Sequence, residues 1–274
     1  SAVRLRLRVP CAAYKHRWGE GYDAVIAHRF KPISMLLILG RWLRIPACIG
    51  VLHGLGEYDR AYRRLEMRCL CSPVWRFVGV SRAVREDLLS CGGGFSESNV
   101  RQINNAIDIR RAEALQHTRA QARELLGLPA DAWVFGTIGR LVPVKGHIHL
   151  LQAFALIKDE YPQALLAIIG EGRSRAELEA AIQDRGLQGR VWLLGAKDDA
   201  LQYVRAFDAF VMPSLSEGLP LALLEGMSPR LPVLGSDIDS LRPILEDCGG
   251  RTFPVAQAPA LAEQLRALLN LSAE

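Results

Sequence analysis

Short β-branched runs alternate with amphipathic stretches along nearly the whole chain, and this alternation limits the possible folds more than any other feature of the sequence. The pattern is typical of βα units that build a parallel sheet. Runs after residue 131 are apolar throughout, as expected for strands that are covered on both faces. We therefore predict an α/β protein, with strands at residues 24–28, 47–53, 77–80, 100–103, 133–138, 165–169, 191–194, 209–212 and 232–235.

The stretches between these runs show helical spacing. The helix predicted over residues 147–159 should cover a sheet face, because its large apolar residues fall on one stripe. These residues are Leu150, Leu151, Phe154 and Ile157. A further helix should begin near Pro220, since proline is favoured in the first helical turn, and a leucine-rich helix should cover residues 259–269.

A polar stretch rich in alanine and arginine, residues 109–129, separates the two halves of the chain. We interpret it as a hinge helix that enters a second domain. The prediction is two α/β domains, residues 1–108 and 109–274, which are ordinary domain sizes.

Charge is unevenly divided between these predicted domains. The net charge of the chain is +5, but residues 1–108 hold 17 Lys and Arg against 9 Asp and Glu, whereas the remainder holds 17 against 20. A basic half suggests an anionic partner, either nucleic acid or acidic lipid headgroups; a solvated basic surface is the alternative. Because no zinc-finger spacing, RNA-binding aromatic motif or basic heptad region is present, we expect no nucleic-acid partner.

Cysteine usage and hydropathy point to a cytoplasmic protein. The six cysteines, at positions 11, 48, 69, 71, 91 and 248, lack paired metal-ligand spacing and are expected to be reduced thiols, so no metal is predicted. The longest apolar run, near residues 33–39, is too short for a membrane span, and no signal peptide opens the chain. Peripheral attachment to the inner face of the cytoplasmic membrane is kept as an alternative.

The segment from Gly139 to Gly146 follows a predicted strand and precedes a predicted helix. A loop in that position binds anions in α/β sheets, because free backbone N–H groups point outward there. Arg140 and Lys145 add two cations, enough to neutralise much of a diphosphate without a metal. An ordinary surface loop with two charges is the alternative.

Two carboxylates flank the start of the next candidate helix. Glu217 precedes Gly218, which allows close backbone approach, and Glu225 lies eight residues further on, among leucines. A carboxylate in such surroundings is costly unless it is hydrogen-bonded, and sugar or ribose hydroxyls are suitable donors. The alternative is an acid that favours the helix dipole together with an exposed helical glutamate.

His28 and His53 each end a predicted strand of the first half. A histidine at a strand end, next to a glycine such as Gly54, can project into a cleft. A purely structural histidine is the alternative for both positions.

Taken together, these segments resemble the retaining glycosyltransferases of GT-B fold grouped as family 4. The resemblance depends on an ordered set of motifs over some 200 residues. The set comprises Val51 to Gly54, Val78 to Ser81, Ile103 to Asp108, Gly139 to Gly146, and Glu217 with Glu225. It implies two Rossmann-like domains across a cleft, with the acceptor held by the first and a nucleotide-diphosphate sugar, most simply of UDP type, by the second.

The resemblance also implies roles for single residues. Arg140 and Lys145 would bind the diphosphate and stabilise the leaving group. Glu217 would hold hydroxyls of the donor sugar, Glu225 the ribose, and His53 would lie near the transferred sugar. The family needs no metal, and of its two conceivable retaining routes the resemblance favours same-face substitution over a covalent carboxylate intermediate.

Backbone groups complete the site that the resemblance implies. The amides of Gly218 and Leu219, at a helix N-terminus, would assist the distal phosphate. Ala196, in the stretch from Leu194 to Ala196, would meet the nucleobase through its backbone.

Three departures from the family pattern stand out. Ala106 follows Asn105 where the family commonly has glycine, and Arg230 follows Pro229 where small residues are usual. The glycine-rich loop after the first strand has no counterpart before Asp23, and the chain opens at Ser1 with Arg4, Arg6 and Arg8 close behind. We therefore expect an incomplete N-terminal domain that lacks its first βα units.

The sequence thus predicts a glycosyltransferase acting on a glycan or lipid-linked acceptor, in bacterial lipopolysaccharide or other cell-envelope polysaccharide synthesis. A sugar-nucleotide epimerase of GT-B fold and a non-catalytic nucleotide-sugar-binding protein are the alternatives. A Rossmann dehydrogenase is excluded, because no GxGxxG follows a first strand with an acid about twenty residues on.

Overall fold

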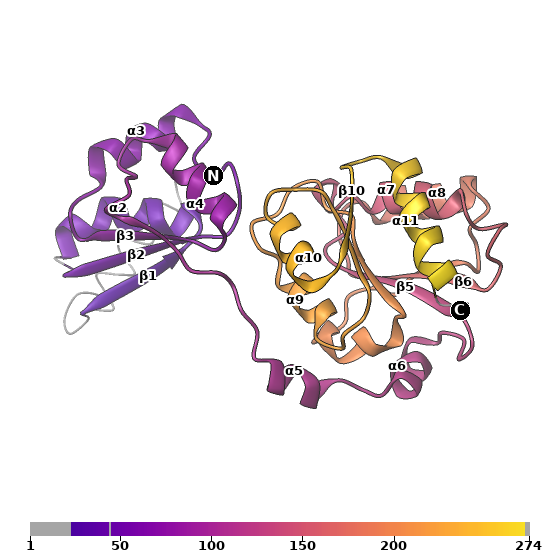
Figure 1. The fold of residues 1–274 in the computed structure, drawn as a ribbon. Helices are drawn as coiled ribbons and strands as arrows, with labels where there is room; N and C mark the ends of the chain where they lie inside the picture. The colour runs from indigo at the N-terminus through magenta and orange to yellow at the C-terminus, as the bar shows by residue number, and fades with distance from the viewer. Residues whose placement is uncertain (1–22, 44, 272–274) are drawn as a thin grey trace. The chain divides into compact units, whose positions relative to one another are not determined.

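The computed structural model describes residues 23–43 and 45–271. The chain forms two compact units, Ser1–Asn105 and Ala106–Glu274, each built on a parallel sheet (Figure 1). The predicted α/β class with two parallel sheets is confirmed. The predicted absence of the first βα units, and the early arginines Arg4, Arg6 and Arg8, concern the chain before Asp23 and lie outside the described residues.

The first unit contains a four-stranded parallel sheet in the order β1-β2-β3-β4. Its strands are β1 (Ala24–His28), β2 (Ala47–Leu52), β3 (Trp75–Gly79) and β4 (Val100–Gln102), and its helices are α2 (Phe30–Leu43), α3 (Ala61–Leu70) and α4 (Arg82–Cys91). Strand β3 begins earlier than the predicted residue 77, because Trp75 and Phe77 lie on the same buried face, where their rings stack with centroids 5.5 Å apart. Helix α4 begins where the Ser81 hydroxyl accepts a hydrogen bond from Val84 N–H.

The second unit contains a six-stranded parallel sheet in the order β10-β9-β8-β5-β6-β7. Its strands are β5 (Trp133–Ile138), β6 (Ala164–Ile169), β7 (Val191–Leu193), β8 (Ala209–Met212), β9 (Val233–Ser236) and β10 (Arg251–Phe253). Every residue of β6, β8 and β9 is buried, as predicted from their continuous apolar character.

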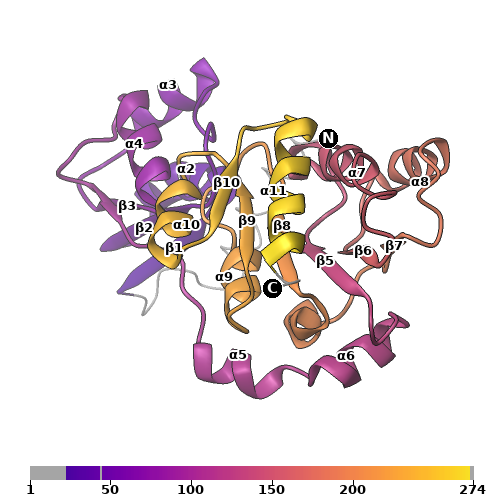
Figure 2. The same ribbon diagram turned by 45° about the vertical axis from the view of Figure 1, so that its right-hand side comes forward.

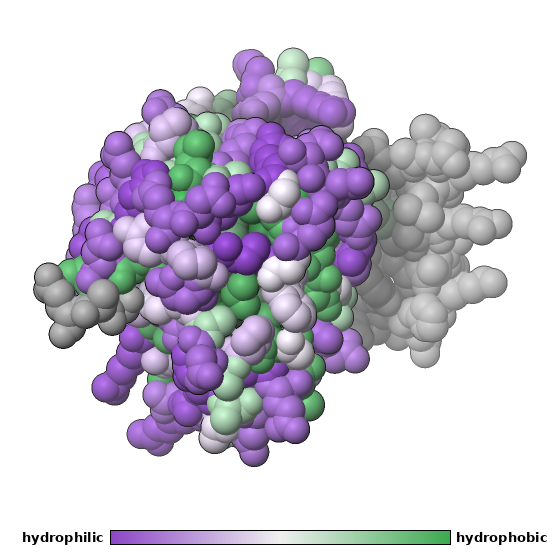
Figure 3. Space-filling model, turned by 90° about the vertical axis from the view of Figure 1, so that its right-hand side faces the viewer, coloured by the Kyte–Doolittle hydropathy of each residue, from purple (hydrophilic) through white to green (hydrophobic). Residues whose placement is uncertain are grey.

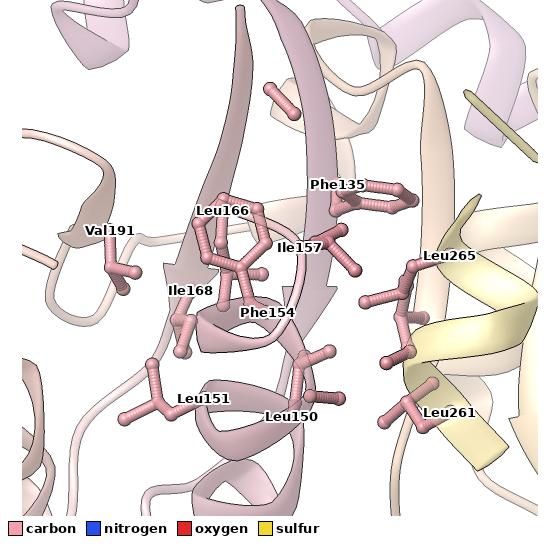
Figure 4. Close-up of a cluster of buried hydrophobic side chains, with 14 of the residues drawn as sticks. Phe135, Leu150, Leu151, Phe154, Ile157, Leu166, Ile168, Val191, Leu261 and Leu265 are labelled. Atoms are coloured by element: carbon pink, nitrogen blue, oxygen red, sulfur yellow. The ribbon is translucent and has the colours of Figure 1, made fainter. Parts of the chain in front are cut away.

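Helices cover both faces of this sheet (Figures 1 and 2). One face packs against α7 (His147–Ala155), α8 (Arg175–Asp184) and α11 (Ala258–Leu271). The other packs against α6 (Arg119–Leu126), α9 (Leu221–Met227), α10 (Arg242–Cys248) and the 3₁₀ segment η2 (Ala200–Ala206). The stripe predicted for α7 is fully buried, and Figure 4 shows its side chains among those of the strands and of α11.

Three details of secondary structure differ from the prediction. Helix α7 ends at Ala155 and not at residue 159, so Ile157, although buried, lies beyond the helix. The stretch 109–129 forms two helices, α5 (Ile109–Leu115) and α6, because Thr118 and Gln121 form a reciprocal capping box that starts a new helix. The edge strand β10 was not predicted. It spans only Arg251–Phe253, which is too short to show an alternation of apolar and polar residues.

A buried arginine joins α6 to the sheet. Arg123 donates to the backbone carbonyls of Ala130 (2.6 Å), Ala132 (2.7 Å) and Ala206 (2.9 Å). It also forms a 2.7 Å ion pair with Asp208, whose carboxylate accepts from Val134 N–H at the start of β5. A buried guanidinium is tolerated because all of these donors have partners.

The face drawn in Figure 3 is predominantly hydrophilic, with apolar side chains in scattered patches. Within residues 23–43 and 45–271, no helix combines the length and the apolar character that crossing a bilayer requires.

We predict that Arg123→Ala destabilises the second unit by about 3–5 kcal/mol, because it leaves the Asp208 carboxylate without its buried partner. The control is Arg119→Ala: this arginine pairs with the same carboxylate, but its side chain is 52% exposed, against 2% for Arg123. The control should cost less than about 1 kcal/mol. Hydrogen exchange of the β5 and β8 amides measures both effects, and equal losses would contradict the assignment.

Candidate functional site

The second sheet changes its winding direction beside β5. From β5 the chain continues through β6 to β7, then returns to place β8 on the other side of β5. Open α/β sheets bind ligands at the carboxyl ends of strands next to such a switch point. The segments after β5 and β8 carry the predicted motifs, so the topology brings these motifs to one edge of the sheet.

Main-chain contacts fix the loop after β5 against the loop after β6. Gly139 N–H donates to Ile169 O at 3.0 Å, and Leu141 N–H donates to Glu171 O at 2.9 Å. Gly170, with φ of 154°, lies so close that a Cβ there would stand 1.9 Å from the Gly139 carbonyl oxygen. Only glycine allows this approach.

The same loop is fixed on its other side by the loop after β8. Gly146 ends the 3₁₀ turn Pro143–Lys145 in the left-handed conformation, where a Cβ would stand 1.9 Å from the Pro213 carbonyl oxygen. Leu215 N–H donates to Val144 O at 2.8 Å. Three loops therefore form one rigid, backbone-bonded platform at the edge of the sheet.

Lys145 and Glu217 meet on this platform. The Lys145 Nζ lies 2.5 Å from Glu217 Oε1, and the two side chains are 18% and 12% exposed. Each charge thus holds the other in place where the loops after β5 and β8 join. An ammonium has three donor hydrogens, so Lys145 can keep this contact and still bind an anion.

Arg140, in the loop after β5, and Ala196, in the loop after β7, are both exposed. Within the described residues, the Arg140 side chain forms no ion pair or hydrogen bond. Ala196 follows Gly195, whose carbonyl accepts from Gly170 N–H at 2.8 Å, so the loop after β7 is tied to the same platform.

Glu225 lies on α9, which packs closely on β8. A Cβ at Gly226 would stand 2.5 Å from the Phe210 ring, so the glycine sets how near α9 comes to the strand. Burial, and secondly the charge of Asp199, raise the pKa of the Glu225 carboxyl. Its carboxylate accepts no hydrogen bond from the described residues, and a half-buried acceptor without a donor is a natural ligand contact. Gly218 and Leu219, just before this helix, are buried.

Sequence reasoning missed His147, the first residue of α7. Its side chain is buried and lies against the Arg140 backbone. Burial, with a smaller effect of the Lys145 charge, lowers its pKa to about 4, so the imidazole is neutral at physiological pH. The signal in the sequence was a histidine directly after Gly146, at a position where an apolar residue would serve the packing.

In the first unit, the predicted histidines meet at the carboxyl ends of β1 and β2. His28 Nδ1 lies 2.8 Å from His53 Nε2. Burial, followed by the charges of His28 and Arg29, lowers the pKa of His53. Glu57, which was not predicted, joins the two strand ends, because its carboxylate accepts from Phe30 N–H (2.7 Å) and His53 N–H (3.2 Å).

The described residues contain no group of three or more His, Cys, Asp or Glu side chains that could hold a metal ion. Arg140 and Lys145 are two cations at this edge of the second sheet, both in the loop after β5.

Residues 118–274 match the glycosyl transferases group 1 family, and residues 2–111 match glycosyltransferase family 4. Because the first match alone covers more than half of the chain, this protein belongs to the glycosyl transferases group 1 family. The family predicted from the ordered motifs is thus confirmed.

Curated relatives and solved structures agree with this assignment. The chain is 27% identical over 234 residues, 82% of its length, to the UDP-Gal:α-D-GlcNAc-diphosphoundecaprenol α-1,3-galactosyltransferase of Escherichia coli. It is 33% identical over 137 residues, half of its length, to the lipopolysaccharide core biosynthesis glycosyltransferase LpsE of Rhizobium meliloti. It spans 60% and 37% of these two relatives.

Among solved structures, Anabaena HepE in complex with UDP-glucose matches with a TM-score of 0.82 at 22% identity, over 98% of this chain and 73% of that one. Sucrose-phosphate synthase of Thermosynechococcus elongatus matches with a TM-score of 0.77 at 24% identity, over 96% and 68%. At this identity the likeness shows the fold, which is the predicted GT-B arrangement of two parallel sheets.

We predict that Glu225→Gln raises the thermal midpoint at pH 7. A raised pKa means that folding favours the neutral carboxyl, so this group stabilises most below its ordinary pKa of 4.5 and loses that effect as pH rises through the raised value. At pH 7 the amide removes the cost of a half-buried charge, and the gain should shrink as pH falls toward 4.5. Scanning calorimetry at several pH values measures it. The control is Glu263→Gln, at an exposed position of α11, and an unchanged or lower midpoint for Glu225→Gln would contradict the prediction.

Proposed function

We propose that this protein is a retaining, metal-independent glycosyltransferase that moves a sugar from a nucleotide-diphosphate sugar, of UDP type, to a glycan or lipid-linked acceptor. The observation that supports the proposal is the platform beside β5, whose backbone-bonded loops carry Lys145 and the exposed Arg140. The helix that follows the β8 loop adds Glu225, whose carboxylate has no hydrogen-bond donor among the described residues. Cations, free carboxylate oxygens and rigid main chain are the groups that a nucleoside diphosphate requires.

The proposed roles follow from these environments. Arg140 and Lys145 bind the diphosphate and stabilise the charge that accumulates on it as the sugar departs. The Glu225 carboxylate accepts hydrogen bonds from ribose hydroxyls, which supply its missing donors. The backbone of Gly218 and Leu219 supports the distal phosphate, and the backbone at Ala196 meets the base.

Glu217 acts as a positioning residue in this proposal. Its carboxylate is held by Lys145 at 2.5 Å, and an ion-paired carboxylate is a poor nucleophile. Same-face substitution, in which the leaving diphosphate accepts the proton of the acceptor hydroxyl, needs no protein nucleophile. The second oxygen of Glu217 remains available for donor-sugar hydroxyls.

We place acceptor binding in the first unit, with His53 near the transferred sugar. The hydrogen bond to His28 and the support of Glu57 hold the His53 ring at the carboxyl end of β2. A bacterial envelope polysaccharide or lipopolysaccharide is the proposed product class, because the Escherichia coli and Rhizobium relatives carry such activities in their names. The proposed location is cytoplasmic, at the inner face of the membrane, where the basic first half would meet anionic lipid.

We predict that UDP binds the chain in the presence of a metal chelator and that Lys145→Ala weakens this binding about ten- to a hundredfold, the usual effect of losing a hydrogen bond to a charged group. Titration calorimetry with UDP, GDP and ADP identifies the base and the affinity. Lys31→Ala, an exposed lysine of the first unit, is the charge-matched control. Equal affinities for wild type and Lys145→Ala would remove the lysine from the site.

We predict a different pattern for Glu225→Ala. This change should weaken UDP binding by about fivefold or more, because it removes the hydrogen bonds from the ribose hydroxyls. Binding of inorganic pyrophosphate, which has no ribose, should be unaffected. The same calorimetric titrations measure both ligands. Parallel losses for UDP and pyrophosphate would show that Glu225 acts on the phosphates or on the fold instead.

Turnover separates the proposed activity from its rivals. Sugar release from UDP-sugar only with an added acceptor supports a transferase. Isomerisation without an acceptor would indicate an epimerase, and UDP binding without either reaction would indicate a binding protein.

A further inference from the structure

Helix α3 of the first unit presents an apolar face to solvent. Tyr62, Leu65 and Cys69 follow one another at helical spacing on one stripe, and all three are exposed, Tyr62 by 48% and Leu65 by 60%. Ala61, also exposed, adjoins the stripe. A surface helix normally turns polar residues outward, so an exposed stripe with an aromatic and an aliphatic side chain is unusual.

Three of the four charged side chains of α3 have partners within the fold. Glu66 accepts a hydrogen bond from the buried Ser34 hydroxyl of α2. Arg63 lies over the Phe30 ring at 4.2 Å and donates to Glu57 O, while Arg64 donates to Asp59 O at 2.6 Å. These contacts fix the rotation of the helix, and Met67 is fully buried beneath it. The outward stripe is therefore set by the fold and does not result from a loosely held helix.

Cations border the outward stripe. Arg60 precedes the first turn and Arg68 lies in the last turn; both are exposed, and neither forms an ion pair with a described residue. Arg63 Nε donates a hydrogen bond to the Tyr62 hydroxyl at 3.1 Å, so a third guanidinium lies at the edge of the stripe. No acidic side chain of α3 faces outward, because Glu66 is bound to α2.

We propose that the outward face of α3, namely Ala61, Tyr62, Leu65 and Cys69 with Arg60 and Arg68 at its edges, docks this protein in the headgroup region of an anionic lipid bilayer. An aromatic and an aliphatic side chain on one stripe, bordered by arginines, is the pattern of helices that lie in the membrane interface. The apolar side chains enter the acyl boundary, while the arginines contact lipid phosphates. The inference assigns a specific surface to the membrane location proposed above. It depends on that proposed location and is independent of the proposed donor site.

Charge favours a bilayer over a second copy of the chain. A two-fold pairing through this face would bring the same patch together on both partners, and thus arginine toward arginine. Acidic headgroups instead complement the cations at both ends of the helix. One short helix gives weak, reversible binding, so single changes on the stripe should be measurable.

Vesicle partition tests the apolar part of the surface. The full chain should sediment with vesicles of equal parts phosphatidylglycerol and phosphatidylcholine, and Leu65→Ser should weaken partition by roughly tenfold, the effect of withdrawing one leucine from an apolar environment. Leu125→Ser is the matched control, because Leu125 on α6 of the second unit is 56% exposed. Failure of the wild type to bind, or equal loss for both variants, would overturn the proposal.

Charge is tested on the same vesicles. Arg68→Gln should weaken partition by about fivefold at low salt, whereas Arg110→Gln, at an exposed position of α5, should have no effect. Higher salt and pure phosphatidylcholine vesicles should both reduce binding of the wild type. Equal binding to neutral and anionic vesicles would overturn the role given to the arginines.

Cys69 reports where the bilayer touches. Maleimide labelling of Cys69, read by peptide mass spectrometry, should slow when vesicles are added, while labelling of Cys248, which is exposed in the second unit, should not. Protection of Cys69 at high protein concentration without vesicles would identify self-association instead and overturn the proposal. Calorimetry of Leu65→Ser with UDP keeps the two proposals apart, since the donor site must be unaffected by a change on α3.

Discussion

Close backbone packing at the carboxyl edge of the second sheet is the constraint on which the rest of the site depends. Gly170 lies against the Gly139 carbonyl, and Gly146 lies against that of Pro213, so the loops after β5, β6 and β8 meet without any side chain between them. Hydrogen bonds between the same loops then hold the platform. The glycines are required at these positions because every other residue would place a carbon about where an oxygen already is.

The ion pair of Lys145 and Glu217 is a consequence of this packing. Its partners lie in the loops after two different strands and are 72 residues apart in the sequence. They meet at 2.5 Å because backbone hydrogen bonds hold these two loops together. A preorganised cation costs little further ordering when an anion arrives. The neutral His147 beneath it avoids a second buried charge next to the lysine.

Sequence reasoning was strong where a pattern has one physical meaning. Continuous apolar runs gave β5 and β8 their observed limits, and the stripe of α7 lies fully in the core. It was weaker where the cause is tertiary. The break at Thr118 depends on a local capping box within a helical composition, and Glu57 became visible only when the ends of β1 and β2 were placed side by side. The lack of a hydrogen-bond donor near Glu225 depends on which side chains surround α9 in the folded chain, and residue spacing in the sequence does not contain that information.

The backbone platform also bears on how such a protein can diversify. Since the shape of the edge is set by main-chain contacts, an exposed side chain that borders it, such as that of Ala196, can vary without disturbing the loops. Specificity can then drift through single substitutions while folding is preserved. The glycines beneath have no such latitude, because a Cβ at Gly146 or Gly170 would collide with a backbone carbonyl. An engineer who wants to change specificity should therefore keep these glycines and vary the exposed side chains around them that do not bind phosphate.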